Sequence, residues 1–232
     1  MIVKKWEKLP DELRTEAVRP YYDALRRQWF SLGCKRCFDV VVSALMLILL
    51  SPVFLILAVA IKLDSPGPVF YRQVRVTQYG KKFRIFKFRS MVSNAEQLGT
   101  QVTVGNDSRI TRVGRVIRSC RLDEICQLID IFRGTMTFVG TRPEVPKYVA
   151  AYTEEMLATL LLPAGVTSEA SIRYKNEDQL LDAAQDVDAV YIHQVLPEKM
   201  KYNLEAIRRY SFWGDLATMV RTVLAVLGRD YE

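Results

Sequence analysis

Two adjacent carboxylates, Asp123 and Glu124, are the residues best suited by type and position to do chemistry. The apolar residues that follow them repeat at helical spacing until Gly134, which predicts a helix that begins at about residues 121–123. The free N–H groups and the dipole at a helix start favour an ionised carboxylate and also a bound phosphate. Acidic residues are equally common in first turns for stability alone, so the pair by itself leaves both interpretations open.

Neighbouring residues on a helix point about 100° apart, so Asp123 and Glu124 are expected to divide their roles. One would face a substrate, and the other a metal ion or a partner. Arg142 lies in a second candidate element, the rigid turn Gly140-Thr-Arg-Pro-Glu144. Arginine suits phosphate because its planar guanidinium binds two oxygens at once. Taken alone this turn is a weak motif, since many loops place Gly and Pro beside Arg.

The whole chain must supply the elements that position these residues. It has 232 residues, half of which are apolar, and a formal net charge of +7. This composition excludes a disordered chain, and it predicts an anionic partner. Four Cys and a single His argue against a disulfide scaffold and a histidine-rich metal centre. The charge is concentrated at 62–92, where eight basic residues stand against one acidic, directly after an uncharged run at 40–61.

The uncharged run is 22 residues long, enough for roughly 30 Å of helix and therefore for a hydrocarbon core. Pro52 follows Ser51 near its middle and is expected to bend or break the helix. Both flanks are basic, whereas a spanning helix should differ in Lys and Arg between its two ends. A segment that enters the membrane, breaks at Ser51-Pro52 and returns satisfies both observations, and a single spanning helix stays open as the alternative.

The remaining pattern predicts an α+β fold that is predominantly helical. Period-two alternation over 69–89, interrupted at Tyr79-Gly80, predicts a β-hairpin, and the polar residues 93–108 predict a loop. Helices are expected over 148–162, 196–210 and 212–227. The apolar stripe of the last helix is expected to be ordinary core rather than a membrane surface. The expected divisions are an N-terminal interfacial extension at 1–33, a re-entrant membrane helix at 34–63 and a compact domain at 64–232 with C-terminal amphipathic helices.

The order of many short motifs resembles one family, the bacterial sugar transferases, and within it the small monotopic phosphoglycosyl transferases that initiate glycoconjugate assembly. The resemblance covers roughly residues 34–175. The motifs, in order, are Lys35-Arg36 with Phe38-Asp39, the break at Ser51-Pro52, Ser65-Pro66-Gly67-Pro68-Val69-Phe70, Gln73-x-Arg75, Lys87-Phe88-Arg89-Ser90-Met91, Asp107-x-Arg109-Ile110-Thr111, Gly114, Arg118, Leu122-Asp123-Glu124, Gln127-Leu128, Gly134-x-Met136 and Val139-Gly140-x-Arg142-Pro143-Glu144.

The resemblance implies transfer of a phosphosugar from a UDP-sugar to polyprenyl (undecaprenyl) phosphate, with release of UMP. It implies that Asp123 is the nucleophile that forms a covalent phosphosugar intermediate and that Glu124 helps to hold Mg²⁺. It further implies a re-entrant segment in the bacterial inner membrane and a catalytic domain that faces the cytoplasm. The residues that it assigns to substrate phosphate are Arg118, Arg142, Lys87 and Arg89.

Several positions depart from the family's common pattern. Thr141 replaces a proline before Arg142, which predicts a looser turn, and Arg121 replaces a serine that would cap the helix, a role that Ser119 is expected to take. The sequence also departs from the family pattern over 163–174, so it does not determine which sugar is transferred. It does not determine the glycan pathway or whether the protein forms a homo-oligomer either. The alternative function is a non-catalytic membrane-tethered adaptor whose basic hairpin binds anionic lipid or nucleic acid. Beside an apolar segment, lipid headgroups are the expected partner and nucleic acid is not.

Overall fold

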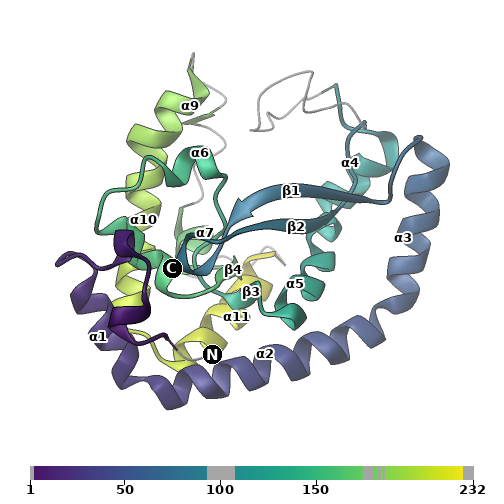
Figure 1. Ribbon diagram of the computed structural model, residues 1–232. Helices are drawn as coiled ribbons and strands as arrows, with labels where there is room; N and C mark the ends of the chain where they lie inside the picture. The colour runs from purple at the N-terminus through teal and green to yellow at the C-terminus, as the bar shows by residue number, and fades with distance from the viewer. Residues whose placement is uncertain (1–2, 93–107, 175–179, 182–183, 185, 227–232) are drawn as a thin grey trace.

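The computed structural model describes residues 3–92, 108–174, 180–181, 184 and 186–226, and over these ranges it is mostly helical with two small sheets (Figure 1). This agrees with the predicted α+β class. The helices are α1 (Arg19–Arg27), α2 (Trp29–Leu49), α3 (Ser51–Asp64), α4 (Arg112–Ser119), α5 (Leu128–Arg133), α6 (Pro146–Val149), α7 (Glu169–Arg173), α9 (Val187–Val190), α10 (Leu196–Arg208) and α11 (Phe212–Val226). The strands are β1 (Phe70–Val76), β2 (Lys82–Phe88), β3 (Met136–Val139) and β4 (Ala164–Thr167).

Short helical turns complete the description. They are the 3₁₀ turns η1 (Trp6–Lys8), η2 (Asp11–Leu13), η3 (Gln78–Gly80), η5 (Leu122–Gln127) and η6 (Met156–Leu161), and the π-helical turn η7 (Tyr191–Val195). The expected loop over 93–108 lies outside the described residues except for residue 108.

The apolar run forms a bent pair of helices, α2 and α3, which meet at the predicted break. Helix α2 ends at Leu49, α3 begins at Ser51, and the two axes differ by 60°. Pro52 cannot donate a backbone hydrogen bond, and the Ser51 hydroxyl donates to the carbonyl of Ile48 at 2.8 Å. Neither helix is long and apolar enough to cross a membrane by itself, but the pair together meets that criterion.

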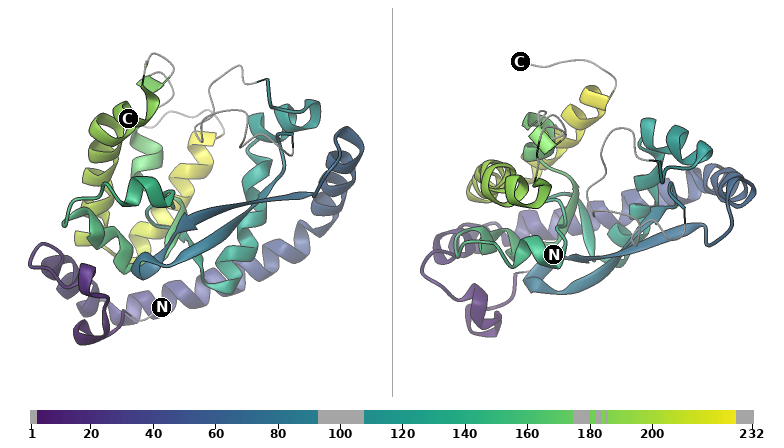
Figure 2. Two further views of the ribbon diagram at one scale, coloured as in Figure 1. Left: turned by 45° about the horizontal axis from the view of Figure 1, so that its top comes forward. Right: turned by 90° about the horizontal axis from the view of Figure 1, so that it is seen from above.

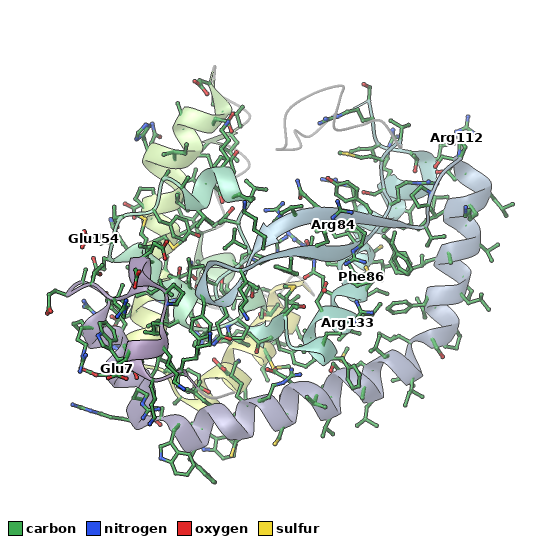
Figure 3. The ribbon with its side chains drawn as sticks, in the orientation of Figure 1. Glu7, Arg84, Phe86, Arg112, Arg133 and Glu154 are labelled. Carbon is green, nitrogen blue, oxygen red and sulfur yellow. The ribbon has the colours of Figure 1, made fainter. Side chains whose placement is uncertain are left out.

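The apolar side chains of this pair face outward rather than into the body of the molecule. Ile48 and Leu49 at the bend are 73% and 76% exposed, and Leu63 near the end of α3 is 84% exposed. Figure 3 shows side chains along α2 and α3 that point away from the rest of the chain. An exposed apolar surface of this extent is typical of a surface that contacts lipid or a partner.

Buried polar side chains at the start of α2 fix this helix to the body. Lys35, which is 2% exposed, donates to Asp215 of α11 at 2.5 Å and to a β3 carbonyl at 2.9 Å. Asp39 accepts a hydrogen bond from the Thr137 hydroxyl at 2.7 Å. Arg36 donates to two carbonyls near the end of α5. Charged groups are stable inside a protein when they are paired in this way, so these residues anchor the bent helix pair to the body.

The predicted hairpin is confirmed as an antiparallel pair, β1 and β2, with Phe70 opposite Phe88 and Val76 opposite Lys82. The hairpin runs from the end of α3 back across the body (Figures 1 and 2). At its α3 end, the ring of Phe88 packs against Phe70 and Phe54 with centroids 5.3 Å apart in both pairs. These aromatic contacts join the strands to α3 of the bent helix pair.

The second sheet is a parallel pair, β3 and β4, in which Met136 lies opposite Ala164. Directly after β3, the backbone of Gly140 comes close to that of Gly165, the second residue of β4. A Cβ atom on Gly165 would lie only 2.2 Å from the nitrogen of Gly140, so a side chain cannot be accommodated there. The approach holds the segment after β3 against the start of β4.

The N-terminal residues pack onto the body through α1. Tyr21 and Leu25 are almost completely buried, whereas Trp29 and Phe30 are 62% and 68% exposed. The cluster includes Leu13, Val18, Tyr22, Leu32, Ala158, Leu160, Leu161, Ile207 and Tyr210. Because α2 begins at Trp29, α1 and α2 follow each other with one residue between them. The proposed division between 33 and 34 remains a prediction.

Two expectations about the later helices are corrected. The single helix over 148–162 is wrong, because α6 ends at Val149 and a separate turn, η6, begins at Met156. The helices over 196–210 and 212–227 are confirmed as α10 and α11. The stripe of α11 is not entirely core, since Trp213, Val220 and Val223 are more than half exposed.

Candidate active site

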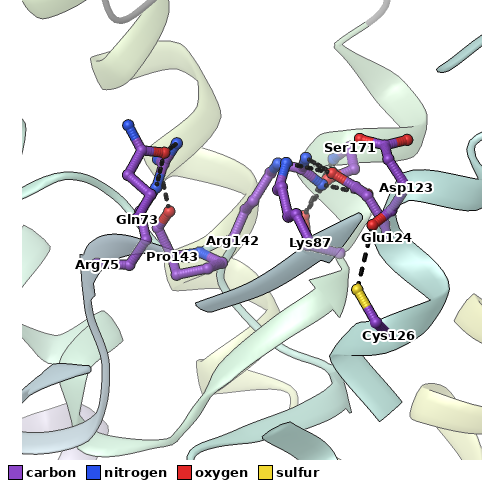
Figure 4. Close-up of polar contacts among 10 residues, drawn as sticks. Gln73, Arg75, Lys87, Asp123, Glu124, Cys126, Arg142, Pro143 and Ser171 are labelled. Carbon is purple, nitrogen blue, oxygen red and sulfur yellow. Dashed lines mark hydrogen bonds and ion pairs between the residues drawn. The ribbon is translucent and has the colours of Figure 1, made fainter. Parts of the chain in front are cut away.

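Glu124 lies between two cations and is the centre of the site (Figure 4). Lys87 donates to its Oε1 at 2.9 Å, and Arg142 donates to Oε1 at 2.5 Å and to Oε2 at 3.4 Å. The Glu124 side chain is 13% exposed, against 21% for Lys87 and 35% for Arg142. The structure therefore brings together three residues that the sequence analysis singled out from three distant segments.

Each of these side chains is delivered by a different element. Lys87 is near the end of β2, opposite Tyr71 in the hairpin, and Glu124 lies on η5, which packs against β2. Arg142 follows β3 in the turn that the sequence analysis identified. That turn is held on one side by a hydrogen bond from the Gly165 N–H to the Thr141 carbonyl at 2.8 Å.

Arg75 holds the other side of this turn. The sequence analysis included it in a family motif but assigned it no role. Its Nη1 donates to the Pro143 carbonyl at 3.1 Å, and its Nε and Nη2 donate to the Gln73 amide oxygen at 3.1 and 2.7 Å. Burial lowers the pKa of Arg75, while the nearby Glu144 carboxylate opposes that shift. The only available sequence signal was its place in Gln73-x-Arg75. The looser turn expected from Thr141 is not observed, because both sides of Arg142 are fixed.

Glu124 is held in its ionised form. Burial alone would raise the pKa of its carboxyl, but the charges and hydrogen bonds of Arg142 and Lys87 outweigh burial and hold the pKa well below its usual range. The carboxylate therefore presents a fixed negative charge that orients both cations.

Asp123, the preceding residue, has a different environment. Burial raises the pKa of its carboxyl and the charge of Glu124 adds to this, whereas Lys87 and Arg118 act in the opposite direction. In the described part of the chain its carboxylate accepts no hydrogen bond from a cationic side chain, while its backbone carbonyl accepts from the Cys126 thiol at 3.4 Å. Glu124 is thus paired with two cations and the Asp123 carboxylate is not, whereas the division of roles between them stays a prediction.

Arg118 lies in the last turn of α4, close enough to Asp123 to lower the pKa of that carboxyl. Its side chain is partly buried and makes no hydrogen bond or ion pair with the residues that the structure describes. An arginine in this state retains its donors for an incoming anion.

Arg89 does not join the cluster. It is 4% exposed, and its guanidinium donates to the carbonyls of Ile61, Ser65 and Pro66 at 3.3, 2.6 and 3.1 Å. These bonds close the C-terminal end of α3. The expectation that Arg89 binds substrate phosphate stays a prediction that these contacts do not support, because its Nη1 and Nη2 donors bond backbone carbonyls and the Ser65 hydroxyl.

The helix start before Asp123 also differs from the expectation. Residues Leu122–Gln127 form a 3₁₀ turn, and α5 begins only at Leu128. Arg121 has φ 51°, in the left-handed region that costs an ordinary residue about 1–2 kcal/mol. Ser119 is not a cap, since its hydroxyl donates to the Val116 carbonyl at 2.9 Å. Strained backbone of this kind is typical of active sites.

A magnesium ion is compatible with this donor set only together with a substrate. Among the described residues, there is no group of three or more Asp, Glu, His or Cys side chains that could hold a metal by itself. Mg²⁺ commonly takes one or two carboxylates and completes its shell with water and phosphate oxygens. Glu124 and Asp123 supply two carboxylates. If Glu124 bound the metal, phosphate oxygens would replace it as the partner of Lys87 and Arg142. The residues therefore fit a metal that arrives with a diphosphate.

The cluster combines three cations with an open, partly buried carboxylate. Such cations stabilise negative charge on a phosphoryl group, and a carboxylate with little solvation is a competent nucleophile. The arrangement can therefore bind a phosphate ester and attack its phosphorus.

Comparisons with known proteins agree with this chemistry. The family model for bacterial sugar transferases matches residues 30–229. The UDP-N-acetylgalactosamine-undecaprenyl-phosphate N-acetylgalactosaminephosphotransferase of Aeromonas hydrophila is 34% identical, over 83% of this chain and 43% of the relative. The UDP-glucose:undecaprenyl-phosphate glucose-1-phosphate transferases of Escherichia coli K12 and Caulobacter vibrioides are 35% and 34% identical, over 82% and 84% of this chain and 39% and 70% of the relatives.

The chain thus spans less than half the length of the first two relatives, and their shared region contains the whole candidate site. The ordered motifs, the Asp123–Glu124 pair with its cations and the match over residues 30–229 lead to one conclusion. This chain belongs to the bacterial sugar transferase family.

Proposed function

We propose that this protein transfers a sugar phosphate from a UDP-sugar to undecaprenyl phosphate and releases UMP. The observation that carries the proposal is the pairing of Glu124 with Lys87 and Arg142 directly beside an open carboxylate, Asp123. The relatives are named as transferases of this type, which supports the same substrates here.

The reaction proceeds in two displacements. A carboxylate oxygen of Asp123 attacks the β-phosphorus of the UDP-sugar, and the bond from that phosphorus to the bridging oxygen breaks, so UMP leaves with the bridging oxygen. A phosphate oxygen of undecaprenyl phosphate then attacks the same phosphorus, and the bond to Asp123 breaks. The products are the lipid diphosphate sugar and the original carboxylate. Covalent catalysis separates one displacement between anions into two assisted steps.

The surrounding residues keep their own roles in both steps. Arg142, Lys87 and Arg118 bind phosphate oxygens and stabilise the charge that develops on them. Glu124 orients Arg142 and Lys87 before the substrate arrives and, with Asp123, is the group placed to hold Mg²⁺. When bound, Mg²⁺ would neutralise diphosphate charge and make UMP a better leaving group.

The bent helix pair, α2 and α3, explains how a soluble donor and a lipid acceptor meet. We propose that α2 and α3 enter the inner membrane from the cytoplasmic face, bend at Ser51-Pro52 and return to it. The basic residues on both flanks and the 60° bend support this topology. The hairpin and α4 then lie at the interface, where undecaprenyl phosphate presents its headgroup.

The first test is UMP release by the purified full chain with UDP-glucose or UDP-N-acetylgalactosamine, undecaprenyl phosphate and Mg²⁺. Asp123→Asn is expected to lose at least a thousandfold in turnover, because an amide is a poor nucleophile. The same variant should fail to retain ³²P from a β-labelled donor, whereas wild type carries it through gel filtration in denaturant. Asp11→Asn, at an exposed carboxylate far from the site, should match wild type in both measurements.

An Asp123→Asn variant with wild-type turnover would overturn the nucleophile assignment. A wild-type protein that releases no UMP from any UDP-sugar, yet binds anionic vesicles in a salt-dependent manner, would instead support the adaptor function.

A further inference from the structure

A cavity of about 320 Å³ lies between the parallel sheet and the helices α10 and α11, and one of its lining residues, Thr141, directly precedes Arg142. It is lined from the sheet side by Thr141 and Ser168, which follow β3 and β4, and from the helix side by Asn203 of α10 and Arg221 of α11. Its volume is at the low end of the roughly 300–1,000 Å³ range of ligand pockets. We call it the β3–α11 cavity.

Its position relates it directly to the phosphate-binding cluster. Thr141 lines the cavity, and the next residue, Arg142, reaches Glu124. The Gly140 N–H donates to the Thr167 carbonyl at 3.0 Å, so the segments after β3 and β4 are joined at the cavity. Ligands of sheets with parallel strands commonly bind outside the carboxyl ends of the strands. The β3–α11 cavity and the cluster around Glu124 therefore share the turn that carries Thr141 and Arg142.

Asn203 shows that the cavity is built for a polar ligand. Its side chain is 95% buried, yet its amide makes only a weak contact, from Nδ2 to the Met200 sulfur at 3.8 Å. No other hydrogen bond involves this amide within the described part of the chain. Its amide oxygen accepts no hydrogen bond from the described residues, so a ligand in the cavity can supply the missing donor.

The charges that line the cavity indicate a neutral ligand. Three arginines stand against three carboxylates, which gives a formal sum of zero. These residues are Arg173, Arg209, Arg221, Glu169, Glu205 and Asp215. A site for phosphate would show an excess of cations, as the cluster around Glu124 does when Arg118 is included. Alternating carboxylates, guanidinium groups and amides suit the many hydroxyls of a sugar.

The polar groups are also fixed in place before a ligand arrives. Glu169 accepts a hydrogen bond from the Thr218 hydroxyl at 2.6 Å and forms an ion pair with Arg221. Arg173 lies with its guanidinium carbon 5.9 Å from the ring centre of Tyr202, and both residues line the cavity. Preorganised polar groups reduce the entropy lost on binding.

We infer that the β3–α11 cavity binds the sugar of the nucleotide-sugar donor and that Asn203 hydrogen-bonds a hydroxyl or acetamido group of that sugar. This inference rests on the proposed function, since it takes the donor to be a UDP-sugar. It assigns donor preference to residues outside the Asp123–Glu124 cluster.

The test uses Asn203→Leu, which keeps the size of the side chain and removes its polar atoms. With the full chain, kcat/KM is measured for UDP-glucose and UDP-N-acetylgalactosamine, together with the inhibition constant of UMP, which lacks a sugar. We expect kcat/KM for the preferred donor to fall about tenfold, the loss of roughly one ligand hydrogen bond. The UMP inhibition constant should stay within twofold of wild type, and the melting temperature should not fall.

The donor kinetics distinguish the two roles, because neither role predicts a lower melting temperature. If Asn203 had only a structural role, Asn203→Leu would be neutral or stabilising and would leave both donors unchanged. Asn203→Ala provides a second variant if leucine distorts the cavity, and Glu198→Gln on the exposed side of α10 is the matched control.

Unchanged donor kinetics in both Asn203 variants, or equal losses for UMP and for the donors, would overturn the inference while wild-type turnover still supports the proposed function. Absence of UMP release by wild type would instead count against the proposed function. In that case titration of wild type and Asn203→Leu with UDP-glucose and UMP decides the inference, because only a sugar site gives a loss confined to UDP-glucose.

Discussion

Glu124 is the residue that organises the candidate site, because one carboxylate orients two cations from distant segments. Its two partners pull the pKa of its carboxyl down against burial, while Asp123, one residue earlier, keeps a raised pKa. Two neighbouring carboxylates thus have opposite electrostatic environments within a single 3₁₀ turn. This separation supports the proposed roles, binding for Glu124 and attack for Asp123.

Arg142 provides a prediction about a single side chain. Arg142→Lys keeps the charge but removes the fork that contacts both oxygens of Glu124, so the cation is no longer fixed for phosphate. We expect kcat/KM for UMP release to fall by about 100-fold, comparable to the loss of one oxyanion donor. Arg115→Lys, at an exposed position of α4, is the control and should retain wild-type activity. An Arg142→Lys variant with more than half the wild-type kcat/KM would contradict the role.

Among the elements, the junction of α3 and α4 decides where Arg118 lies. Arg89 binds carbonyls at the end of α3, and Asp64, the last residue of α3, accepts from the Val113 N–H at the start of α4 at 2.9 Å. A carboxylate at a helix start satisfies a free N–H group and interacts favourably with the dipole. The end of the bent helix pair is thereby connected to α4, the helix that carries Arg118.

Asp64 gives a pH-dependent prediction for this junction. Hydrogen bonds from Thr111 and Val113 hold the pKa of its carboxyl below its ordinary value of about 3.9. Because the folded pKa is lower than the unfolded one, the stabilisation is present above that value and is lost as pH falls through the folded pKa. At pH 7, Asp64→Asn should lower the free energy of unfolding by about 0.5 kcal/mol, because the amide oxygen can still accept from the Val113 N–H but the negative charge at the start of α4 is lost.

Urea denaturation in detergent at pH 7 and pH 3 measures this difference, which should shrink at the lower pH. Asp23→Asn, at a half-exposed carboxylate paired with Arg19, is the charge-matched control and should change stability far less. An equal loss for Asp64→Asn at both pH values would show that the charge of the carboxylate is not involved.

The whole molecule is defined by the relation of the bent pair to the body. Polar side chains at the start of α2 bind the body, and aromatic packing of α3 on the hairpin holds the other end, so the exposed bend at Ile48 and Leu49 projects away. A re-entrant segment of this shape would place both ends of the pair on one side of the membrane.

Labelling of single introduced cysteines tests this topology. In a background that lacks the four native cysteines, Lys5→Cys and Lys81→Cys place exposed thiols before α2 and after α3. A membrane-impermeant maleimide should label both in inside-out vesicles and neither in intact spheroplasts. Labelling of the two positions from opposite sides would demonstrate a spanning helix instead.

The sequence by itself determined the local features of this protein. Alternation predicted the hairpin, proline chemistry predicted the break at Ser51-Pro52, and the motif order identified Asp123, Glu124, Arg118, Arg142 and Lys87, because these depend on residue type and short spacing. It failed where tertiary contacts override local preference. The 148–162 helix is interrupted, and the turn at Asp123 is 3₁₀ after a left-handed Arg121.

Only the tertiary structure decided how basic residues divide between the candidate site and the scaffold. Lys87 and Arg89 are two residues apart on one strand, and local sequence does not distinguish them, yet one contacts Glu124 and the other closes α3. Asn203 and the β3–α11 cavity carry no sequence motif, because a cavity forms only where distant helices and strands meet. Local chemistry fixes which groups are available, and long-range packing fixes which of them meet.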